Sequence, residues 1–292
     1  MPQADLHGRH TGRRRRRRQA IAAAALLLLP FAVSAQPGPD SPPRSEAIGF
    51  LPFDPVGGEP QEEGRPVVRQ AGETVDGRWV AQLDRTDRGW TLTLAEHPEG
   101  AGDSLFHFWG LILPAVHDAD ERPEIWPHIL VDVDGAVLIG VERTRSNGFS
   151  GGGESSTRLL LHRLPPERGA LSPAGEVPLS ATASIRACFD EDDRRARLDA
   201  CHDEYVFETT LAAEPGPAGG RSRLILVTRA RTFPGRRSRT EDSLAGPPLR
   251  RADLVWADDP ACSYRRVYTF DAETGRYQPD EPLPDCPDYF GF

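Results

Sequence analysis

The chain has 292 residues and a formal net charge of −9, and all 35 of its basic residues are Arg. The absence of Lys excludes every mechanism that needs one, including Schiff-base chemistry and the phosphate-binding Gly-Lys-Ser/Thr loop. The acidic balance argues against nucleic acid as a partner.

The first 35 residues have the three-part pattern of a cleavable signal peptide. Arginines at 13–18 precede an apolar run from Ile21 to Ala32 and the small-residue end Val33-Ser34-Ala35. The apolar run, about a dozen residues, is shorter than the roughly 18 that a bilayer span needs. We predict cleavage after Ala35, with the Sec route favoured over the twin-arginine route. The mature chain is then expected to be soluble and periplasmic or secreted, with no transmembrane segment.

Removal of residues 1–35 also changes the charge of the protein. It takes away seven Arg and one Asp, which leaves 28 Arg against 43 acidic residues and a formal charge of 28 − 43 = −15. Residues 36–73 are rich in Pro and Gly and predict a flexible leader. Residues 74–292 are long enough for a single β-rich domain with its own core.

Two hairpins are indicated near the start of this domain. Arg78–Leu83 and Trp90–Leu94 alternate like strands on either side of a polar turn. His128–Asp132 is expected to pair with Ala136–Glu142 through a two-residue turn at Asp134-Gly135.

Strand-like alternation continues through the rest of the chain, and helical periodicity is nearly absent. The one candidate helix is Glu191–Ala200, capped by Asp190. The pattern predicts a mainly β fold, with antiparallel sheets arranged as a β-sandwich or a propeller-like array and one short peripheral helix. The further predicted strands are Thr157–Leu164, Ala183–Phe189, Glu204–Ala212, Arg223–Phe233, Asp253–Ala257 and Arg265–Phe270.

The four cysteines all lie in the C-terminal third of the chain. An even number of cysteines in an exported protein predicts disulfides, and three pairings are formally possible. We favour the nearest-neighbour pairing, Cys188 with Cys201 and Cys262 with Cys286. Each short loop would then stabilise the fold by about 3 kcal/mol.

Gly148–Gly152 matches the G-x-S-x-G pattern, in which a strand-to-helix turn presents a serine nucleophile. The following segment reads as a strand, so the helix that the pattern requires is missing. His162 and His202 follow Ser150, but neither lies in a recognisable triad motif. A hydrolase with Ser150 as nucleophile is therefore the alternative hypothesis, not the preferred one.

Two stretches resemble metal sites in composition alone. Asp132-Val133-Asp134-Gly135 is similar to the middle of a calcium loop, but Leu130 and Val141 occupy ligand positions in that frame. A second stretch contains histidines and acids without a ligand spacing. We assign no metal and no cofactor to either. The second stretch contains His107, His117, Asp118, Asp120, Glu121, Glu124 and His128.

The segment from Arg221 to Arg251 has nine Arg and two acidic residues, a charge of +7 in an acidic protein. Alternation places Arg229 and Arg231 on one face of a predicted strand, and a loop with further arginines follows. The interpretation favoured for the charges is ion pairing with neighbouring acids. The preferred function is a periplasmic or secreted binding or envelope-associated module. Its hypothetical ligand is an acidic glycan or another anionic envelope component, held by Arg229, Arg231, Arg236 and Arg237.

Overall fold

A computed structural model describes residues 51–56, 67–86, 88–97, 107–114 and 122–290. In this part of the chain the fold is mainly β and its strand pairs are antiparallel, as the sequence predicts. The predicted signal peptide and the first part of the predicted leader lie outside the described residues.

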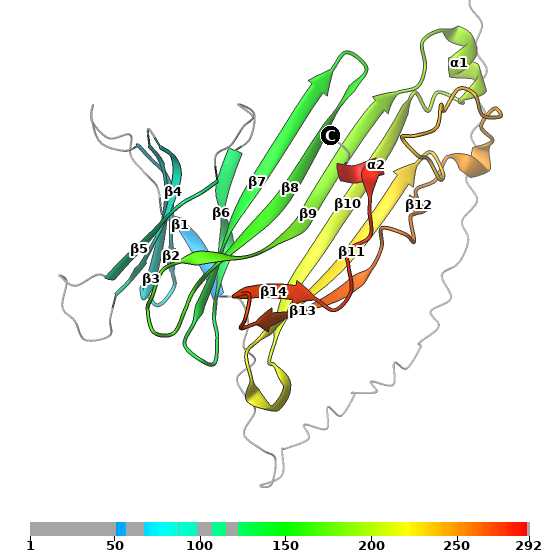
Figure 1. Cartoon of the computed structure of the whole chain (residues 1–292). Coiled ribbons are helices and arrows are strands. Elements are labelled where there is room, and N and C mark those ends of the chain that lie inside the picture. Colours follow the sequence, from blue (N-terminus) through cyan, green and yellow to red (C-terminus); the bar gives the residue numbers. More distant parts are fainter. Residues whose placement is uncertain (1–50, 57–66, 87, 98–106, 115–121, 291–292) are drawn as a thin grey trace, which may run out of the picture. The chain divides into compact units, whose positions relative to one another are not determined.

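The strands form two antiparallel sheets (Figure 1). β2 to β5 make the smaller sheet and β6 to β14 the larger, while β1 pairs with β6 at its start and with β2 at its end. Two short α-helices and two 3-10 turns complete the described residues. The elements are β1 (Leu51–Val56), β2 (Val67–Thr74), β3 (Trp79–Thr86), β4 (Gly89–Glu96), β5 (His107–Ile112), β6 (Arg122–Val131), β7 (Val137–Phe149), β8 (Gly152–Leu164), β9 (Ser172–Arg186), α1 (Glu191–Ala196), β10 (His202–Glu214), η1 (Pro217–Gly219), β11 (Arg223–Phe233), η2 (Arg251–Asp253), β12 (Ala257–Asp258), β13 (Arg265–Asp271), β14 (Arg276–Pro279) and α2 (Pro287–Phe290).

The two sheets share an apolar core. Trp79 and Leu94 of the smaller sheet belong to the same buried cluster as Ile129 and Ile139 of the larger sheet. The smaller sheet packs against the β6–β7 end of the larger sheet, so this part of the fold corresponds to the sandwich alternative of the prediction. Further along the larger sheet, a third buried cluster contains Tyr205 and lies beneath α2.

Two strands lie where the sequence predicts a flexible leader. β1 pairs with β2 from Phe53 to Val56, and β2 continues up to Thr74. Strand pairing among the described residues therefore begins before residue 74. These strands are hard to recognise in the sequence because they contain Pro and Gly. Proline, as at Pro52 and Pro55, has no backbone N–H and is found in sheets only where the ladder needs no donor.

Two local features also differ from the prediction. The β6–β7 connection is a three-residue loop, because Asp132 N donates to Ala136 O and Gly135 takes a φ of +81°. The predicted two-residue turn is therefore wrong by one residue. α1 has the predicted cap at Asp190 but ends before residue 200, where Leu198 and Asp199 have positive φ.

The cysteines pair as nearest neighbours in the structure. Cys188 joins Cys201 and Cys262 joins Cys286, with sequence separations of 13 and 24 residues. The second bridge ties α2 to the segment that follows β12. Among the described residues no cysteine is free.

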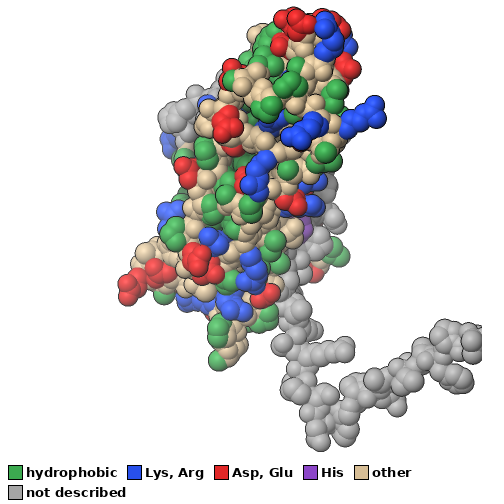
Figure 2. Space-filling view, turned by 90° about the vertical axis from the view of Figure 1, so that its right-hand side faces the viewer, with side chains coloured by type: hydrophobic (Ala, Val, Ile, Leu, Met, Phe, Trp, Pro, Cys, Tyr) green, Lys and Arg blue, Asp and Glu red, His purple; other side chains and the backbone are tan. Residues whose placement is uncertain are grey.

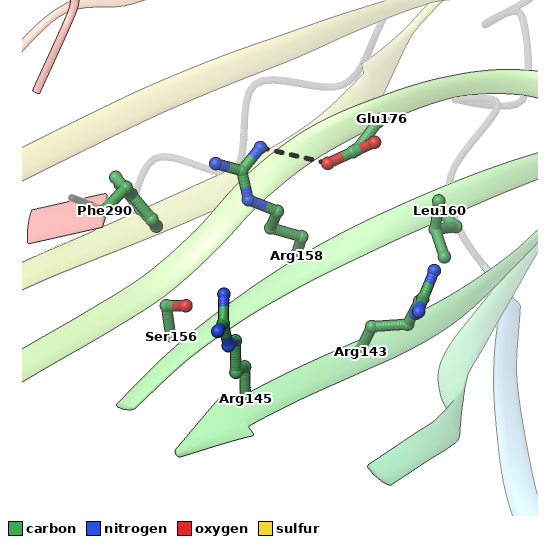
Figure 3. Close-up of a pocket in the computed structure, with 7 residues that line it drawn as sticks. All are labelled: Arg143, Arg145, Ser156, Arg158, Leu160, Glu176 and Phe290. Atoms are coloured by element: carbon green, nitrogen blue, oxygen red, sulfur yellow. Dashed lines mark hydrogen bonds and ion pairs between the residues drawn. The ribbon is translucent and has the colours of Figure 1, made fainter. Parts of the chain in front are cut away.

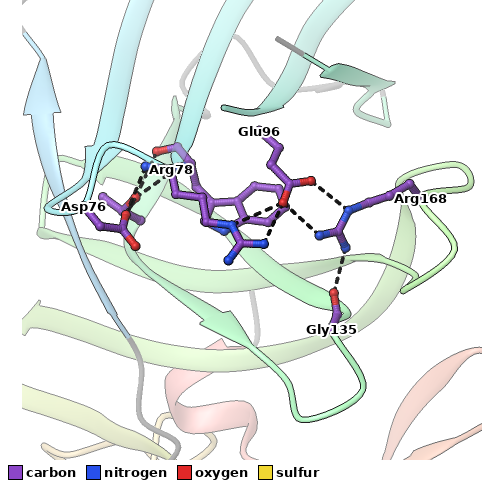
Figure 4. A network of polar contacts seen from close by, with 7 residues as sticks. Asp76, Arg78, Glu96, Gly135 and Arg168 are labelled. Atoms are coloured by element: carbon purple, nitrogen blue, oxygen red, sulfur yellow. Dashed lines mark hydrogen bonds and ion pairs between the residues drawn. The ribbon is translucent and has the colours of Figure 1, made fainter. Parts of the chain in front are cut away.

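A buried glutamate links the smaller sheet to two loops of the larger one (Figure 4). Glu96 Oε1 accepts hydrogen bonds from Arg78 and Arg168, at 2.9 and 3.0 Å, and Oε2 accepts another from Arg168 at 2.9 Å. Arg168 also donates to Gly135 O at 2.7 Å. Burial alone would raise the pKa of Glu96, but the hydrogen bonds and charges of the two arginines lower it.

We expect Glu96→Gln to lower the free energy of unfolding by about 2 kcal/mol, because hydrogen bonds to a charged group contribute about 1.5–3 kcal/mol. Chemical denaturation of the oxidised protein measures the change. Glu273→Gln, at an exposed turn position, serves as the control. Equal stability of the two variants would show that the Glu96 network does not stabilise the fold.

Candidate functional site

The glycine-rich residues of the G-x-S-x-G match form the tight end of the long β7–β8 hairpin. Ser150 and Gly151 make its two-residue turn. From this turn the register places Arg143 directly opposite Arg158. Arg145 lies two residues further along β7 and therefore shares the face of Arg143.

These three arginines line a cavity of about 270 Å³ (Figure 3). The cavity lies over β7, β8 and β9, and the last residue of α2 contributes to its wall. Its volume is slightly below the range of about 300–1,000 Å³ for drug-sized ligands, so it suits a small chemical group. The lining residues are Arg143, Arg145, Ser156, Arg158, Leu160, Glu176 and Phe290.

Arg158 is held from two directions in this cavity. Its Nη1 donates to Glu176 Oε1 at 3.0 Å, and its guanidinium carbon lies 5.4 Å from the centre of the Phe290 ring. About half of each charged side chain is exposed, 50% for Arg158 and 43% for Glu176, so water screens the ion pair. Arg158 is thus positioned without being withdrawn from solvent.

Phe290 is itself fixed by packing. Its ring meets Phe207 of β10 edge-on at 4.9 Å, and the neighbouring Tyr289 is buried. Cys286, directly before α2, is tied to Cys262. The apolar wall of the cavity is therefore anchored to the core of the larger sheet.

The cavity is lined mainly by guanidinium groups. Three arginines and one glutamate contribute to its wall, and Arg143 lies directly opposite Arg158 on the neighbouring strand. Guanidinium forks match carboxylate and phosphate oxygens in geometry, so the lining has the donor groups that an anion requires.

The predicted set of four arginines is divided by the sheet. Arg229 pairs with Asp258 at 3.2 Å, and Arg231 pairs with Glu208 at 3.5 Å and lies over the Trp256 ring. These contacts agree with the interpretation that the charges pair with neighbouring acids. Figure 2 likewise shows basic and acidic side chains interspersed over one face of the molecule.

The other two arginines of that set lie elsewhere. Arg237 is 3.9 Å from Asp203 and donates to Pro234 O, while Arg236 is exposed. Asp203 and Glu208 lie an odd number of residues apart on β10 and so face opposite sides of the sheet. The structure therefore does not bring the four side chains together, and anion binding by this set stays a prediction.

Ser150 is not in a nucleophile elbow, because a strand and not a helix follows its turn. His162 lies ten residues along β8 from Gly152, about 33 Å at the usual rise per residue. His202 is separated from the turn by β9, about 10 Å for two strand spacings. Neither histidine is within hydrogen-bond reach of Ser150.

In the segment that is similar to a calcium loop, Asp132 and Asp134 accept hydrogen bonds from other protein groups. Asp132 Oδ1 accepts from both the backbone N and the hydroxyl of Ser222 at 2.9 Å. Asp134 Oδ2 accepts from Arg163 at 3.0 Å and from Arg221 at 2.8 Å. These contacts give Asp132 and Asp134 a structural role at the β6–β7 loop.

The histidine-rich stretch is only partly described. His117, Asp118, Asp120 and Glu121 lie outside the described residues. His107 and His128 belong to different sheets, while Glu124 lies opposite Glu142, whose pKa is raised by burial and by the charge of Glu124. In the part of the chain that the structure covers, no group of three or more candidate ligands could hold a metal.

Comparison with known proteins found no relative. No family model matches the chain, and no curated protein and no solved structure matches it. In the described part of the chain, neither helix has the length and apolar character that crossing a bilayer requires. Function must therefore be argued from the site itself.

The sequence does contain a signal for the arginine cavity, although the G-x-S-x-G pattern does not indicate it. A two-residue hairpin turn at Ser150-Gly151 pairs Arg143 with Arg158 and Arg145 with Ser156 by counting outward. The contribution of Phe290 has no comparable local signal, because it depends on the path of the C-terminal segment.

The burial of His162 on β8 makes the stability of the protein depend on pH. Its side chain is 1% exposed, and neither ring nitrogen has a hydrogen-bond partner among the described residues. Burial lowers the pKa of His162 to about 4. The folded state therefore binds fewer protons than the unfolded state between about pH 6.5 and 4, and stability is lost as the pH falls through this interval.

Between pH 7 and pH 4 we expect burial of His162 to cost wild type on the order of 3 kcal/mol of unfolding free energy. His162→Leu should not show this loss. Denaturation curves across this range, compared with wild type, measure the difference. His202→Leu, which alters an exposed histidine, should keep the wild-type slope. If the unfolding free energy of His162→Leu depended on pH as that of wild type does, burial of His162 would not be the cause of the loss.

Proposed function

We propose that this protein is an exported binding module that holds an anionic group of an envelope component in the cavity lined by Arg143, Arg145 and Arg158. The single observation that carries the proposal is the convergence of three arginines and one carboxylate on one small cavity. An acidic glycan is the polymer class that fits this chemistry, because its repeated carboxylate or ester groups match guanidinium forks.

Export to the periplasm or the exterior is supported by two independent features. The N-terminal residues have the charge and apolar pattern of a signal peptide. Both cysteine pairs are at disulfide distance, and disulfides persist in oxidising compartments. Export places the cavity in contact with envelope polymers.

Binding is preferred to hydrolysis because of what lines the cavity. A serine nucleophile needs an adjacent base and an oriented third group. Ser156 is the hydroxyl residue of the lining, and no histidine is among the described lining residues. The alternative nucleophile, Ser150, lies at a hairpin turn without a histidine in reach.

Binding of the exported, oxidised protein to polygalacturonate, with neutral dextran as reference, tests this function. We expect wild type to bind the acidic polymer and the triple variant Arg143→Gln/Arg145→Gln/Arg158→Gln to lose at least tenfold in affinity. Each charge-assisted hydrogen bond contributes about 1.5–3 kcal/mol, and about 1.4 kcal/mol corresponds to tenfold. Surface plasmon resonance or calorimetry gives the dissociation constants.

The quadruple variant Arg229→Ala/Arg231→Ala/Arg236→Ala/Arg237→Ala is the informative comparison, because it removes more positive charge outside the cavity. It should bind like wild type. Loss of binding in this variant, with retention in the triple variant, would move the site to β11 and its loop. No binding of wild type to any acidic polymer or small anion would overturn the proposed function.

A further inference from the structure

A second cavity, of about 690 Å³, is lined by residues of β7, β8, β9 and β10, which run side by side in Figure 1. Each strand contributes three consecutive residues, so the cavity extends across the strands and not along them. Three strand spacings of about 4.8 Å give it a length of about 14 Å. The middle residue of each run of three points to the opposite face of the sheet, so the outer two provide the side chains that border the cavity. The lining residues are Ser146, Asn147, Gly148, Gly153, Glu154, Ser155, Thr182, Ala183, Ser184, Glu204, Tyr205 and Val206.

Most of the polar side chains that border this cavity are hydroxyls. Ser146 alternates with Arg145 on β7, so the cavity lies on the face opposite to the arginine cavity. The hydroxyls of Ser146 and Ser155 are 3.0 Å apart and share one hydrogen bond. Because a hydroxyl has one donor and two acceptor positions, this pair retains one donor and three acceptors. Among the described residues, the hydroxyls of Thr182 and Ser184 have no protein partner and face solvent.

The charges around the cavity are balanced. Glu204 borders it and has no ion pair in the described part of the chain. Arg186 is its diagonal neighbour on β9 and donates through Nε to Cys188 O at 2.7 Å, so a backbone carbonyl and not a carboxylate is its partner. Arg231 and Glu208, the next charges on this face, pair with each other. Glu204 therefore disfavours an acidic ligand and Arg186 a cationic one, whereas the hydroxyls of an uncharged ligand can donate to Glu204.

An aromatic surface continues the cavity on the side of β11. Phe233 lies opposite Glu204 across β10 and β11, and its ring centre is 5.7 Å from that of Trp256. Arg231, which shares the face of Phe233, has its guanidinium carbon 5.4 Å from the centre of the same indole. These contacts hold Trp256 on the face that carries the cavity, yet it is 42% exposed. One side of a sugar ring consists of C–H groups, so an exposed indole can pack against it.

We propose that this cavity binds an uncharged glycan in an extended conformation, with Trp256 packed against a sugar ring at one end. The spacing of the strands is similar to the length of one sugar residue in an extended β-1,4-linked chain, so neighbouring strands present their polar groups to successive sugars. The volume is within the range of about 300–1,000 Å³ for ligand sites. The site lies on the other face of the sheet from the arginine cavity and does not rest on the function proposed for that cavity.

Calorimetric titration of the oxidised protein with matched hexasaccharides tests the ligand class. Cellohexaose is uncharged and extended, and maltohexaose has the same sugars in a curved chain. At about pH 6, below the pKa of an amine, a glucosamine hexamer is cationic. Wild type should bind cellohexaose at least tenfold more tightly than either of the others. Hexagalacturonate is compared in the triple variant Arg143→Gln/Arg145→Gln/Arg158→Gln, where it should bind at least tenfold more weakly than cellohexaose.

Variants connect the binding to this face. Thr182→Val/Ser184→Ala should lose at least tenfold in affinity for cellohexaose, because each neutral hydrogen bond contributes about fivefold. Trp256→Ala should also lose at least tenfold, and Trp256→Phe, which keeps an aromatic ring, should retain most of the affinity. Thr210→Val is the matched control, because Thr210 is exposed on the same face of β10 and does not line the cavity. Thermal unfolding of each variant checks that it is folded.

Equal affinity of wild type and the Thr182/Ser184 variant for cellohexaose would overturn the proposal, as would equal affinity of wild type for cellohexaose and maltohexaose. Sedimentation that shows a dimer of wild type, abolished in the same variant, would assign this face to a second copy of the chain and would also overturn it. Binding of polygalacturonate by the Thr182/Ser184 variant measures the arginine cavity separately, so the failure of one site is distinguished from the failure of the other.

Discussion

The close approach of Gly152 to β9 is the constraint on which the arrangement of the larger sheet depends. Gly152 has a φ of +154°, and a Cβ at this position would lie 1.8 Å from the backbone oxygen of Ser184. Only glycine allows β8 to begin here and to pair at once with β9. Because the turn and the start of β8 are fixed, the register of every later pair along β7 and β8 is fixed with them, including that of Arg143 with Arg158.

A register shift further along β8 then shapes the cavity. Between Thr157 and Arg158 the pairing with β9 slips, so that Arg158 lies opposite Pro178 and Leu160 opposite Glu176. Proline cannot donate to the ladder and is found at such irregularities. Bulges commonly redirect side chains beside binding sites. Here the shift accompanies the placement of a carboxylate from β9 within hydrogen-bond distance of an arginine from β8.

Local patterns in the sequence predicted much of this fold. β11 runs from Arg223 to Phe233 as expected, because a β-branched and apolar run at Leu224–Val227 is followed by the alternation of buried and more exposed residues up to Phe233. The strands β1 and β2 were not predicted, because Pro and Gly are unfavourable at most strand positions. Whether a proline disrupts a strand depends on whether its position needs a donor for the ladder. Ser150 drew attention as a motif residue, although the glycines around it serve the backbone and not a nucleophile.

The site was harder to predict than the fold because its parts are brought together by different causes. The three arginines follow from one hairpin register and are accessible to counting along the sequence. Arg231 and Arg237 lie in different surroundings because their partners, Glu208 and Asp203, face opposite sides of β10. Predicting this separation requires the strand pairing to be known. Net charge along a segment does not determine which side chains share a surface.

The apolar wall connects the site to the compartment in which the protein is expected to function. α2 has four residues, too few to be stable as an isolated helix. It is held by the Cys262–Cys286 bridge, by Asp288, which accepts from Arg239 N at 2.9 Å, and by the buried Tyr289. Because Phe290 ends this helix and lines the cavity, the complete wall of the proposed site depends on a disulfide, a bond that persists in oxidising compartments. The Cys262–Cys286 bridge thus links the geometry of the cavity to the compartment that the sequence predicts.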